Sequence, residues 1–538
     1  SEILGLKIEQ IRVTNPDVGG GFGMKAMGYP EEFVVSFAAI KLKKPVRWIS
    51  ERTEAMLSDN AGRDLKHLAE LAFDKTNKIV GYRVNTFCNL GAYNSRFGQN
   101  IQTGLFSKVL MGVYDVQTTY LNVLGIYTNT TQVDAYRGAG RPEAIYLLER
   151  MMDRAARELK IDPLELRRIN FIKKDNFPYR SSTGETIDVG DFDRVLSAAE
   201  ISADIAGFER RKKESEAKGM LRGLGLCYYI ESILGDPSEE AKVVFEEGLD
   251  VKIFVGTQSN GQGHETVFAQ FLSDQIGIPI EKITVVQGDT DLIPNGGGTG
   301  GSRSVTVQNN ATLATVEKVI QSFSQYLSEK LEVSLENIEF DDISFRINGS
   351  NYSPNVLEVA KMAFDDHRFD LLTHSAKATL DARSFPNGAH FAEVEVDPET
   401  GFVQVVRYSV VDDFGNLINP MLAQGQVHGG VAQGIGQALY EHVVFDQEGQ
   451  LLTATFMDYG MPRAQDLPYY KFETECVPST ANIMGMKGCG EAGTVGALAA
   501  VANAVQDALW DVGIQQVDMP FTSEKIWSMI NLGNLAAE

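Results

Sequence analysis

One carboxylate, Glu491, stands in the sequence where it could do acid–base chemistry. It lies between Gly490 and Gly493, directly ahead of an apolar stretch over residues 497–509 that predicts a buried helix. A carboxylate in that position is unlike a solvated surface acid and is a candidate general base. The alternative is an acid that only stabilises the helix start through the helix dipole. The residues by themselves leave both interpretations open.

Five glycine-rich loops, each ahead of a predicted helix, form a second chemical signal. They cover residues 19–23, 137–141, 261–264, 296–302 and 488–493. Glycine lets the backbone approach a ligand closely, and the free N–H groups at a helix start attract anions. A single such loop is usually only a tight turn. Five such loops in one chain indicate a large, anionic ligand whose several groups are each bound by the backbone of a different loop.

A dinucleotide on a Rossmann unit is the first candidate for that ligand, because residues 21–26 match G-x-G-x-x-A. In a Rossmann unit, however, the helix starts at the glycines themselves. Here Gly28, Tyr29 and Pro30 intervene before the predicted helix. A nicotinamide or flavin dehydrogenase of that type is therefore disfavoured, and the chain contains no G-x-x-x-x-G-K-[ST] nucleotide site.

Protein ligands for a metal are not grouped along this sequence. The four cysteines form no C-x-x-C pair, so neither a zinc ribbon nor an iron–sulfur cluster can be built from this chain alone. His264 and Glu265 begin an H-E-x-x-H pattern, but Phe268 occupies the place of the second histidine. The few scattered cysteines also predict no disulfide scaffold, and we expect a cytoplasmic location with reduced thiols.

The charge of the chain excludes several classes of partner. Its 538 residues include 72 acidic and 49 basic ones, which gives a net charge of −23. Such a surface repels phosphate backbones and anionic lipids, so no nucleic-acid or membrane-surface partner is expected. No stretch approaches the ~18 uninterrupted apolar residues that a membrane span needs.

Taken in order, the loops resemble those of the molybdenum-binding large subunits of xanthine dehydrogenase, aldehyde oxidoreductase and aerobic carbon monoxide dehydrogenase. The matching segments are VGGGFGMK (18–25), AYRGAGRPEA (135–144), GQGHET (261–266), TGGSRS (299–304), GQVHGG (425–430) and KGCGEAG (487–493). Six ordered motifs over nearly the whole chain make this resemblance specific. It implies a mixed α and β (α+β) fold with two large molybdopterin-binding domains.

The resemblance also implies how the cofactor is bound. Molybdenum is held by the molybdopterin with no direct protein ligand, and Phe22 and Arg137 lie adjacent to the metal. The residues implied to bind the cofactor are Gly21, Phe22, Gly23, Arg137, Gln262, Gly263, Gly301, Ser302, Arg303, Ser304 and Gln426. The cytosine dinucleotide form of the pterin, frequent among bacterial relatives, is the form expected here.

Glu491 matches the catalytic glutamate of this family. The resemblance implies that it acts as a general base while an aldehyde or aromatic N-heterocycle is oxidised with water as the oxygen source. The electrons then pass to [2Fe-2S] clusters and FAD, for which this chain has no sequence, so an iron–sulfur subunit and an FAD subunit are expected. A non-catalytic relative that holds or assembles the cofactor is the alternative, and the retained Glu491 speaks against it.

Departures from the family pattern narrow the range of substrates that we expect. The positions that handle purines in the family are occupied here by Ala26, Leu105 and Ala139. Xanthine is therefore disfavoured. Gly138 stands where carbon monoxide dehydrogenases carry a copper-binding cysteine, so carbon monoxide oxidation is disfavoured as well. The family also has a further domain ahead of the first glycine loop. We expect a separate chain to supply it, unless this chain is a cut fragment.

The elements that must position these residues follow from apolar spacing and turn residues. Helices are predicted over 30–42, 142–159, 208–217, 264–276, 304–331, 426–442 and 494–512. Strands are predicted over 7–14, 46–49, 79–89, 223–229, 241–245, 251–255 and within 390–411, with a hairpin centred on Asn348 and Gly349. A turn-rich stretch at 176–191 sets the main boundary. It gives residues 1–180 as the first molybdopterin-binding domain and residues 190–538 as the second, which carries Glu491.

Overall fold

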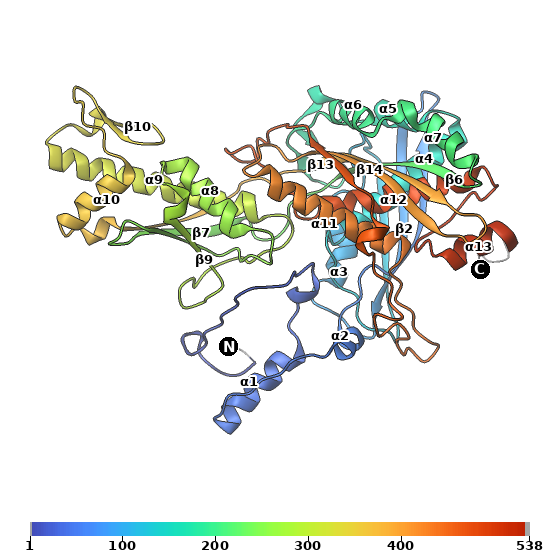
Figure 1. Ribbon diagram of the computed structural model, residues 1–538, viewed down its shortest axis with the longest axis horizontal. Coiled ribbons are helices and arrows are strands. Elements are labelled where there is room, and N and C mark those ends of the chain that lie inside the picture. Colours follow the sequence, from blue (N-terminus) through green and yellow to red (C-terminus); the bar gives the residue numbers. More distant parts are fainter. Residues whose placement is uncertain (1–2, 533–538) are drawn as a thin grey trace.

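The chain folds into two lobes that lie side by side along the longest axis of the molecule (Figure 1). The computed structural model describes residues 3–532. The smaller lobe is formed by the segment from β7 to β12, residues 238–379, and the larger lobe by the chain on both sides of that segment. Mixed α and β structure is present in both lobes, as predicted.

The centre of the larger lobe is a four-stranded sheet in the order β15-β14-β13-β6. Its strands are β6 (Leu221–Ile230), β13 (Asn387–Val396), β14 (Val403–Asp413) and β15 (Tyr470–Thr474). The helices around it are α4 (Arg141–Leu159), α6 (Phe192–Ala203), α11 (Pro420–Leu439) and α12 (Ala492–Trp510). Helix α12 covers one face of the sheet, against Gly223 and Gly225 of β6. Helix α6 covers the other, where Phe192 packs edge-on against Tyr228.

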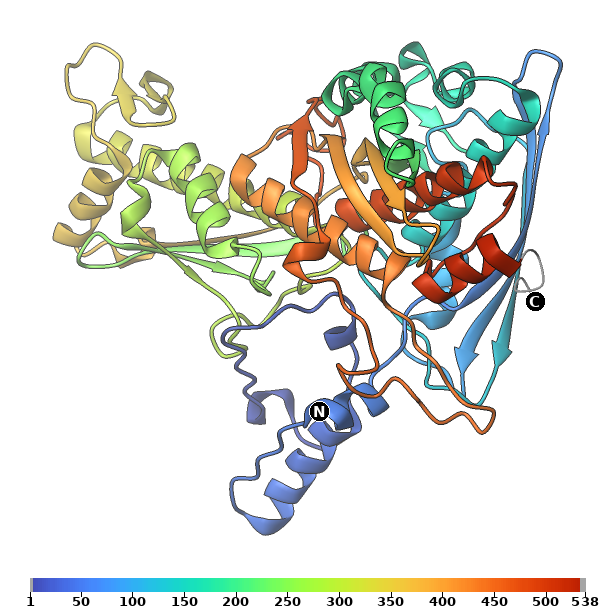
Figure 2. The same ribbon diagram turned by 45° about the vertical axis from the view of Figure 1, so that its right-hand side comes forward.

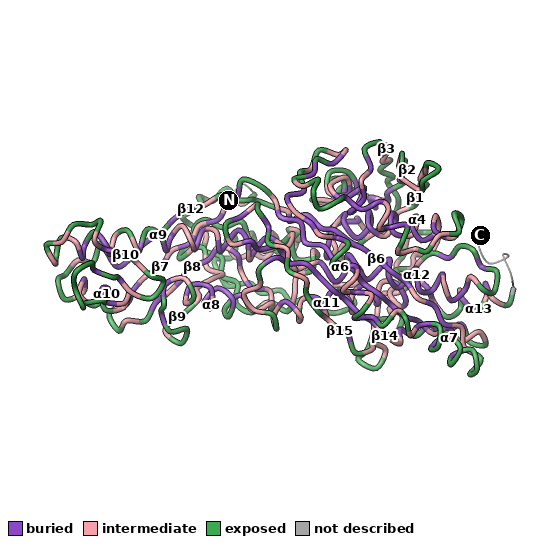
Figure 3. Tube along the Cα trace, turned by 90° about the horizontal axis from the view of Figure 1, so that it is seen from above, coloured by how far each residue is buried: buried purple, intermediate pink, exposed green. Residues whose placement is uncertain are grey.

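The placement of α12 depends on small residues at its contact with β6. An added Cβ at Gly225 would stand 2.0 Å from the carbonyl oxygen of Ala500, and one at Gly223 would stand 2.0 Å from that of Ala504. Helix and strand therefore approach more closely than any side chain allows. Every residue of α12 except Asp507 and Trp510 is buried, and Figure 3 shows the buried chain running along α12 and its neighbours. The start of α12, which carries Glu491, is therefore rigidly set.

A second sheet with the order β1-β2-β3 flanks the larger lobe (Figure 2). Its strands are β1 (Leu65–Phe73), β2 (Ile79–Gly91) and β3 (Thr119–Tyr127). Other elements of this lobe are α3 (Gly98–Asn100), α5 (Pro163–Asn170), β4 (Tyr179–Arg180), β5 (Thr186–Ile187), α7 (Phe208–Glu216) and α13 (Ser523–Leu532). The N-terminal segment, with α1 (Pro30–Leu42) and α2 (Arg52–Ser58), projects away from both lobes in Figures 1 and 2. Helix α1 contains no buried residue.

The smaller lobe is a four-stranded sheet in the order β12-β7-β8-β9, covered by helices. Its elements are β7 (Ser238–Phe245), β8 (Val251–Val255), α8 (His264–Ile276), β9 (Ile283–Val286), α9 (Ser304–Leu331), β10 (Ile338–Phe340), β11 (Phe345–Ile347), α10 (Val356–Asp365) and β12 (Thr373–Thr379). Phe323 of α9 packs on Phe245 of β7 with ring centroids 5.3 Å apart. The helices predicted over 30–42, 264–276 and 304–331 are confirmed in full.

Three predictions of local structure are wrong. Residues 7–14 contain a 3-10 turn (Ile8–Gln10) and a single bridge from Thr14 to Asp289, because no neighbouring strand is there to pair with them. Residues 46–49 have no regular structure for the same reason. The predicted hairpin exists, but its turn spans 341–344, where the Asp341 carboxylate accepts the N–H of Ser344 at 2.8 Å. Gly349 lies after β11.

The boundary predicted at residues 180–190 does not divide the hydrophobic cores. Leu148 of α4, Tyr228 of β6 and Val501 of α12 belong to a single core, whereas the smaller lobe has its own core around Phe268 and Phe323. The extents of the two cofactor-binding domains, 1–180 and 190–538, stay a prediction. No helix in the described part of the chain is long and apolar enough to cross a membrane.

Candidate active site

The glycine loops of the sequence meet at the junction of the two lobes. The N–H of Gly20 donates to the carbonyl of Asn260 at 3.0 Å, which joins the first loop to the loop ahead of α8. An added Cβ at Gly488 would stand 2.0 Å from the carbonyl oxygen of Ser302. One at Gly493 would stand 2.3 Å from the carbonyl oxygen of Val427. The loops therefore interleave so closely that side chains are excluded at their contacts.

Glu491 lies at the centre of this junction. Its Oε1 accepts the N–H of Gly138 at 2.8 Å. Its Oε2 pairs with Nη2 of Arg141 and lies 2.9 Å from Oγ of Ser302. Burial alone would raise the pKa of Glu491, but the Arg141 charge and the hydrogen bonds to this carboxylate outweigh it and lower the pKa below its ordinary value. The carboxylate is therefore ionised at neutral pH.

The contacts of Glu491 bear on the alternative that it only stabilises a helix start. Glu491 is the N-cap residue of α12, but its side chain accepts no hydrogen bond from the N–H groups of that helix. All of its described partners come from other segments: the loop ahead of α4, the first residue of α4 and the loop ahead of α9. A carboxylate has about four acceptor positions, and Oε1 carries a single described donor. Glu491 thus keeps a free acceptor position.

Arg137 joins its own loop to the loop ahead of α12 and to helix α11. Its Nε donates to the carbonyl of Gly490 at 2.7 Å, Nη1 to Gln433 Oε1 at 3.0 Å and Nη2 to the carbonyl of Gln426 at 3.0 Å. The half-exposed ring of Phe22 lies over the guanidinium at 5.4 Å. The structure thus brings Phe22, Arg137 and Gln426 together beside Glu491, and their roles in cofactor binding stay a prediction.

Arg303 differs in its surroundings from the other predicted cofactor-binding residues. Its guanidinium is buried and donates to the carbonyls of Asp236, Gly298 and Ser238 at 2.7, 2.6 and 3.0 Å, and to Glu239 Oε1 at 2.8 Å. Each of its three nitrogens thus has a partner within the chain. Four of its five N–H donors are bonded in this way, so the side chain of Arg303 chiefly shapes the loop over 296–302.

The remaining predicted residues lie on the same loops. Gln262 Oε1 accepts the N–H of Asn260 at 2.5 Å, which closes the loop that ends at Gly263. An added Cβ at Gly23 would stand 2.3 Å from the carbonyl oxygen of Ala135. The other predicted positions are Gly21 beside Asn260, Gly301 and Ser302 with positive φ, and Ser304 as the first residue of α9.

The predicted substrate positions lie on the side of the larger lobe. Ala139 precedes Gly140, where an added Cβ would stand 3.0 Å from the carbonyl carbon of Leu105, so Ala139 and Leu105 are close neighbours. The exposed Ala26 accepts a hydrogen bond at its carbonyl from Nη1 of Arg96 at 3.1 Å. Sequence reasoning did not anticipate Arg96 there.

Sequence reasoning also missed Arg141 and Glu231. Both side chains are fully buried, and Arg141 Nη2 lies 3.3 Å from Glu231 Oε1. Arg141 is part of a quoted motif, but spacing does not show in which direction its side chain points. Glu231 follows the apolar run that forms β6. An acid directly after such a run is the one feature of the sequence that indicates a buried carboxylate here, because a buried charge needs a partner.

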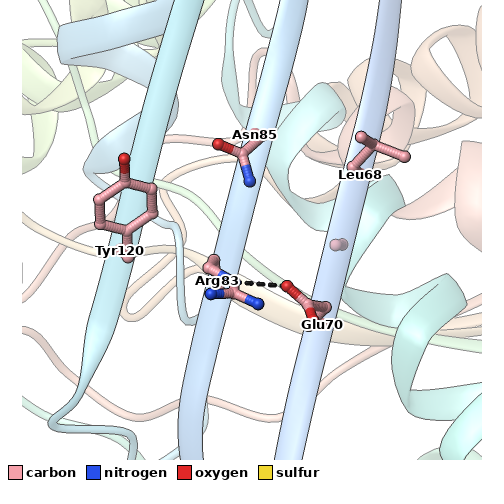
Figure 4. A pocket seen from close by; sticks show the side chains of 6 residues that line it. Leu68, Glu70, Arg83, Asn85 and Tyr120 are labelled. Carbon is pink, nitrogen blue, oxygen red and sulfur yellow. Dashed lines mark hydrogen bonds and ion pairs between the residues drawn. The ribbon is translucent and has the colours of Figure 1, made fainter.

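Two depressions elsewhere contain none of the predicted residues. The first lies on the exposed face of the β1-β2-β3 sheet, with a volume near 650 Å³, and is lined by Leu68, Ala69, Glu70, Arg83, Asn85 and Tyr120 (Figure 4). An ion pair between Glu70 and Arg83 crosses its floor. The second, near 220 Å³, is lined by residues 233–237, Val307 and residues 380–383.

The junction leaves room for a ligand beside several glycines. Gly298, Gly300 and Gly425 have open space where a side chain would stand, so the backbone there is free to approach a ligand. Among residues 3–532, no three His, Cys, Asp or Glu side chains are gathered as a metal site. The absence of a direct protein ligand to the metal stays a prediction.

Comparisons with known proteins decide the family. Two family models, each described as a molybdopterin cofactor-binding domain, match residues 1–171 and 198–468. The carbon monoxide dehydrogenase large chain of Hydrogenophaga pseudoflava is 33% identical over 558 residues, which cover 100% of this chain and 69% of the relative. The chain belongs to the molybdenum hydroxylase large-subunit family. It is a molybdopterin-dependent oxidoreductase.

Other relatives show how varied the chemistry of molybdenum hydroxylases is. The nicotine 6-hydroxylase large subunit of Paenarthrobacter nicotinovorans is 33% identical and is matched over 98% of this chain and 67% of its own. The solved structure of quinoline 2-oxidoreductase from Pseudomonas putida 86 superposes with a TM-score of 0.91 at 31% identity, over 97% of this chain and 69% of the other. The predicted fold of two molybdopterin-binding domains is confirmed.

Proposed function

We propose that this molybdenum hydroxylase subunit oxidises an aromatic N-heterocycle or an aldehyde with water as the oxygen source. The observation that carries the proposal is the ionised carboxylate of Glu491, which is bonded to two other segments and keeps a free acceptor position at Oε1. A scaffold that only stored the cofactor would not need an ionised carboxylate there, so a non-catalytic role is disfavoured.

The residues of this chain have separate tasks in the reaction. When bound, the molybdenum–pterin cofactor supplies the two-electron redox centre and the activated oxygen. Glu491 would accept, at Oε1, the proton released when the substrate is hydroxylated. Gly138 N–H and Arg141 hold the carboxylate in one orientation. Arg137 and Phe22 would lie beside the metal, and the loops would hold the cofactor chiefly through their backbone.

The substrate class follows from the residues around Glu491. Leu105 and Ala139 offer neither a charge nor an aromatic ring to hold a purine. Gly138 has no thiol for copper, and an added Cβ there would stand 2.3 Å from Pro142 Cγ. Two relatives support N-heterocycles, since their names are nicotine 6-hydroxylase and quinoline 2-oxidoreductase. The relative named carbon monoxide dehydrogenase keeps carbon monoxide as the second candidate.

The wider assembly is part of the same proposal. We infer that an iron–sulfur subunit and an FAD subunit receive the electrons, and that the pterin carries a cytosine dinucleotide. Relatives named "large chain" and "large subunit" support an assembly with further chains. A separate chain would supply the part of the relatives' large subunits that this chain does not cover. The cytoplasmic location expected from the scattered cysteines stays a prediction.

A substrate screen tests the proposal. The purified complex is given an artificial electron acceptor and, one at a time, N-heterocycles, aldehydes, xanthine and carbon monoxide. We expect N-heterocycles or aldehydes to exceed xanthine in kcat/KM by several orders of magnitude, because polar discrimination of that size needs paired groups that Leu105 and Ala139 lack. Efficient turnover of xanthine or carbon monoxide would contradict the assignment of this pocket.

A further inference from the structure

Two carboxylates meet beside the cofactor loops, and the proposed function uses only Glu491. The second, Glu231, follows the end of β6 and is fully buried. Its Oε1 lies 2.7 Å from Oγ of Ser302 and 3.3 Å from Nη2 of Arg141. Its Oε2 has no hydrogen-bond partner in the described part of the chain. A buried carboxylate with so few partners needs an explanation.

The hydrogen atoms of this cluster can be counted. Ser302 Oγ lies 2.7 Å from Glu231 Oε1 and 2.9 Å from Glu491 Oε2. A hydroxyl group has one hydrogen to donate, so it satisfies only one of these oxygens as a donor. The other contact is a hydrogen bond only if that carboxyl group carries a proton of its own. One of the two glutamates is therefore protonated.

The charges around Glu231 and Glu491 also indicate that one of the two carboxyl groups is protonated. Arg141 contacts both carboxyl groups. Arg137 faces them from the loop ahead of α4, but its donors are bonded to Gly490, Gln433 and Gln426. The other titratable groups that face Glu231 are Tyr229 and Cys489, both uncharged at neutral pH because burial raises the pKa of each. Two buried anions that share one bonded cation would be costly.

The proton belongs to Glu231. Glu491 has the Gly138 N–H at 2.8 Å and the closer contact with Arg141, and 14% of its side chain is exposed. Glu231 has the longer contact with Arg141, an orphaned oxygen and no exposure. In agreement, burial and the charge of Glu491 raise the pKa of Glu231 well above its ordinary value, although Arg141 opposes the shift.

We propose that Glu231 is held protonated and is a positioning residue for Glu491: its proton bonds to Ser302 Oγ, and Ser302 donates to Glu491 Oε2. This inference rests on the proposed role of Glu491. The chain of hydrogen bonds fixes Oε2 from the protein side, so that Oε1 is the oxygen left for the substrate side. Glu231 itself remains neutral and does not exchange its proton with the substrate.

The first test is the pH profile of kcat/KM, measured on the complex and normalised to its molybdenum content. Glu231→Gln replaces a neutral donor by another, so the acid limb, which reports Glu491, should stay where it is. Glu231→Leu removes the donor and frees Ser302 to rotate, and should lower kcat by about 10- to 100-fold through misplacement of the base. If Glu231 were ionised, Glu231→Gln would instead shift the acid limb down by about 1–3 pH units.

Two further readouts do not depend on activity. The infrared difference between wild type and Glu231→Gln at neutral pH should contain the C=O stretch of a protonated carboxylic acid. Glu239 is also fully buried but is bonded to Arg303 at 2.8 Å, and the matched Glu239→Gln difference should lack that band. Because a raised folded-state pKa contributes stability that is lost as pH rises, wild type should lose stability relative to Glu231→Gln as the pH rises above about 4.3, the pKa of a free glutamate.

The outcomes separate this inference from the function beneath it. If Glu491→Gln remains active, the proposed base is wrong, whatever Glu231 does. If Glu491→Gln is inactive while Glu231→Gln shows no acid band and a lowered acid limb, the base stands and the protonated Glu231 is rejected. If kcat is kept in Glu231→Gln and lost in Glu231→Leu, and the infrared band of the protonated acid is present, both the base Glu491 and the protonated Glu231 are supported.

Discussion

At the residue scale, the account depends on how few side chains fix the candidate base. Glu491 is bonded to Gly138 and Arg141 of one segment and to Ser302 of another, and both segments are far from Glu491 in the sequence. Arg137 stands next to this group and makes no bond to the carboxylate. Its contacts are with the carbonyl of Gly490, in the loop ahead of α12, and with Gln426 and Gln433 of helix α11. The two arginines therefore have different tasks: Arg141 holds the base, and Arg137 holds the loops that bind the cofactor.

A conservative change at Arg137 separates these tasks. Lysine cannot reach Gly490, Gln433 and Gln426 at once, so Arg137→Lys leaves two acceptors unpaired, at a cost of about 1–3 kcal/mol each. We expect the molybdenum content of the purified protein, measured by metal analysis, to fall well below that of wild type.

Arg150→Lys is the matched control for this change. Arg150 joins α4 to the carbonyls of Ala502 at 3.0 Å and Val517 at 2.8 Å, away from the loops. It should lower the melting temperature and leave the molybdenum content unchanged. Equal metal loss in both variants would show that Arg137 acts only through general stability.

At the element scale, the position of Glu491 is set by the contact between α12 and β6. Gly223 and Gly225 let the helix backbone lie directly on the strand, and the buried helix has no freedom to shift. The smaller lobe contributes Ser302 through the loop ahead of α9, so the base is completed only where the two lobes meet.

Gly225→Ala tests that contact. The added Cβ would stand 2.0 Å from the carbonyl oxygen of Ala500 and 2.2 Å from the nitrogen of Ala504, both of them backbone atoms. Overpacking of this kind costs about 1–3 kcal/mol, which a denaturant midpoint measures. Gly248→Ala, in the turn after β7 with its nearest contact at 3.8 Å, should change stability by less than about 0.5 kcal/mol. If the two variants were equally stable, α12 would be free to move.

The elements also show what a sequence can predict. Helices with a strong apolar period and a clear start, such as α8 and α9, were predicted to the residue. Strands 7–14 and 46–49 were wrong because an apolar run becomes a strand only when another strand pairs with it, and sequence spacing does not show the pairing. At the site, glycine motifs located the loops. Arg141 and Glu231 were missed because their roles depend on contacts between distant segments.

At the scale of the whole molecule, the chain presents apolar surface that it does not itself cover. Helix α1 has no buried residue, and Val34, Phe37 and Leu42 are more than half exposed. A helix of 13 residues is marginal in water without packing partners. This agrees with the proposal that the chain works within a larger assembly.

The prediction at this scale concerns the composition of the active protein. We expect active preparations to contain further chains that bring iron–sulfur clusters and flavin, since this chain has no sequence for either centre. Light scattering after size exclusion, with iron and flavin analysis of the same peak, measures this. A monodisperse, fully active preparation of this chain alone, loaded with molybdenum, would contradict it.

The central claim is that Glu491 is the general base of a molybdenum hydroxylase, and Glu491→Gln tests it most directly. The amide is nearly isosteric but cannot accept a proton at neutral pH. We predict that kcat falls by ~10²–10⁴ with molybdenum content close to wild type, and that the melting temperature falls because the fully buried Arg141 loses its closest anionic partner. Glu358→Gln, which alters an acid that caps α10 through the N–H of Asn355 at 2.8 Å, should leave kcat unchanged. Loss of a general base usually lowers kcat more than about tenfold. A Glu491→Gln enzyme that kept more than roughly a tenth of the wild-type kcat would therefore contradict the account.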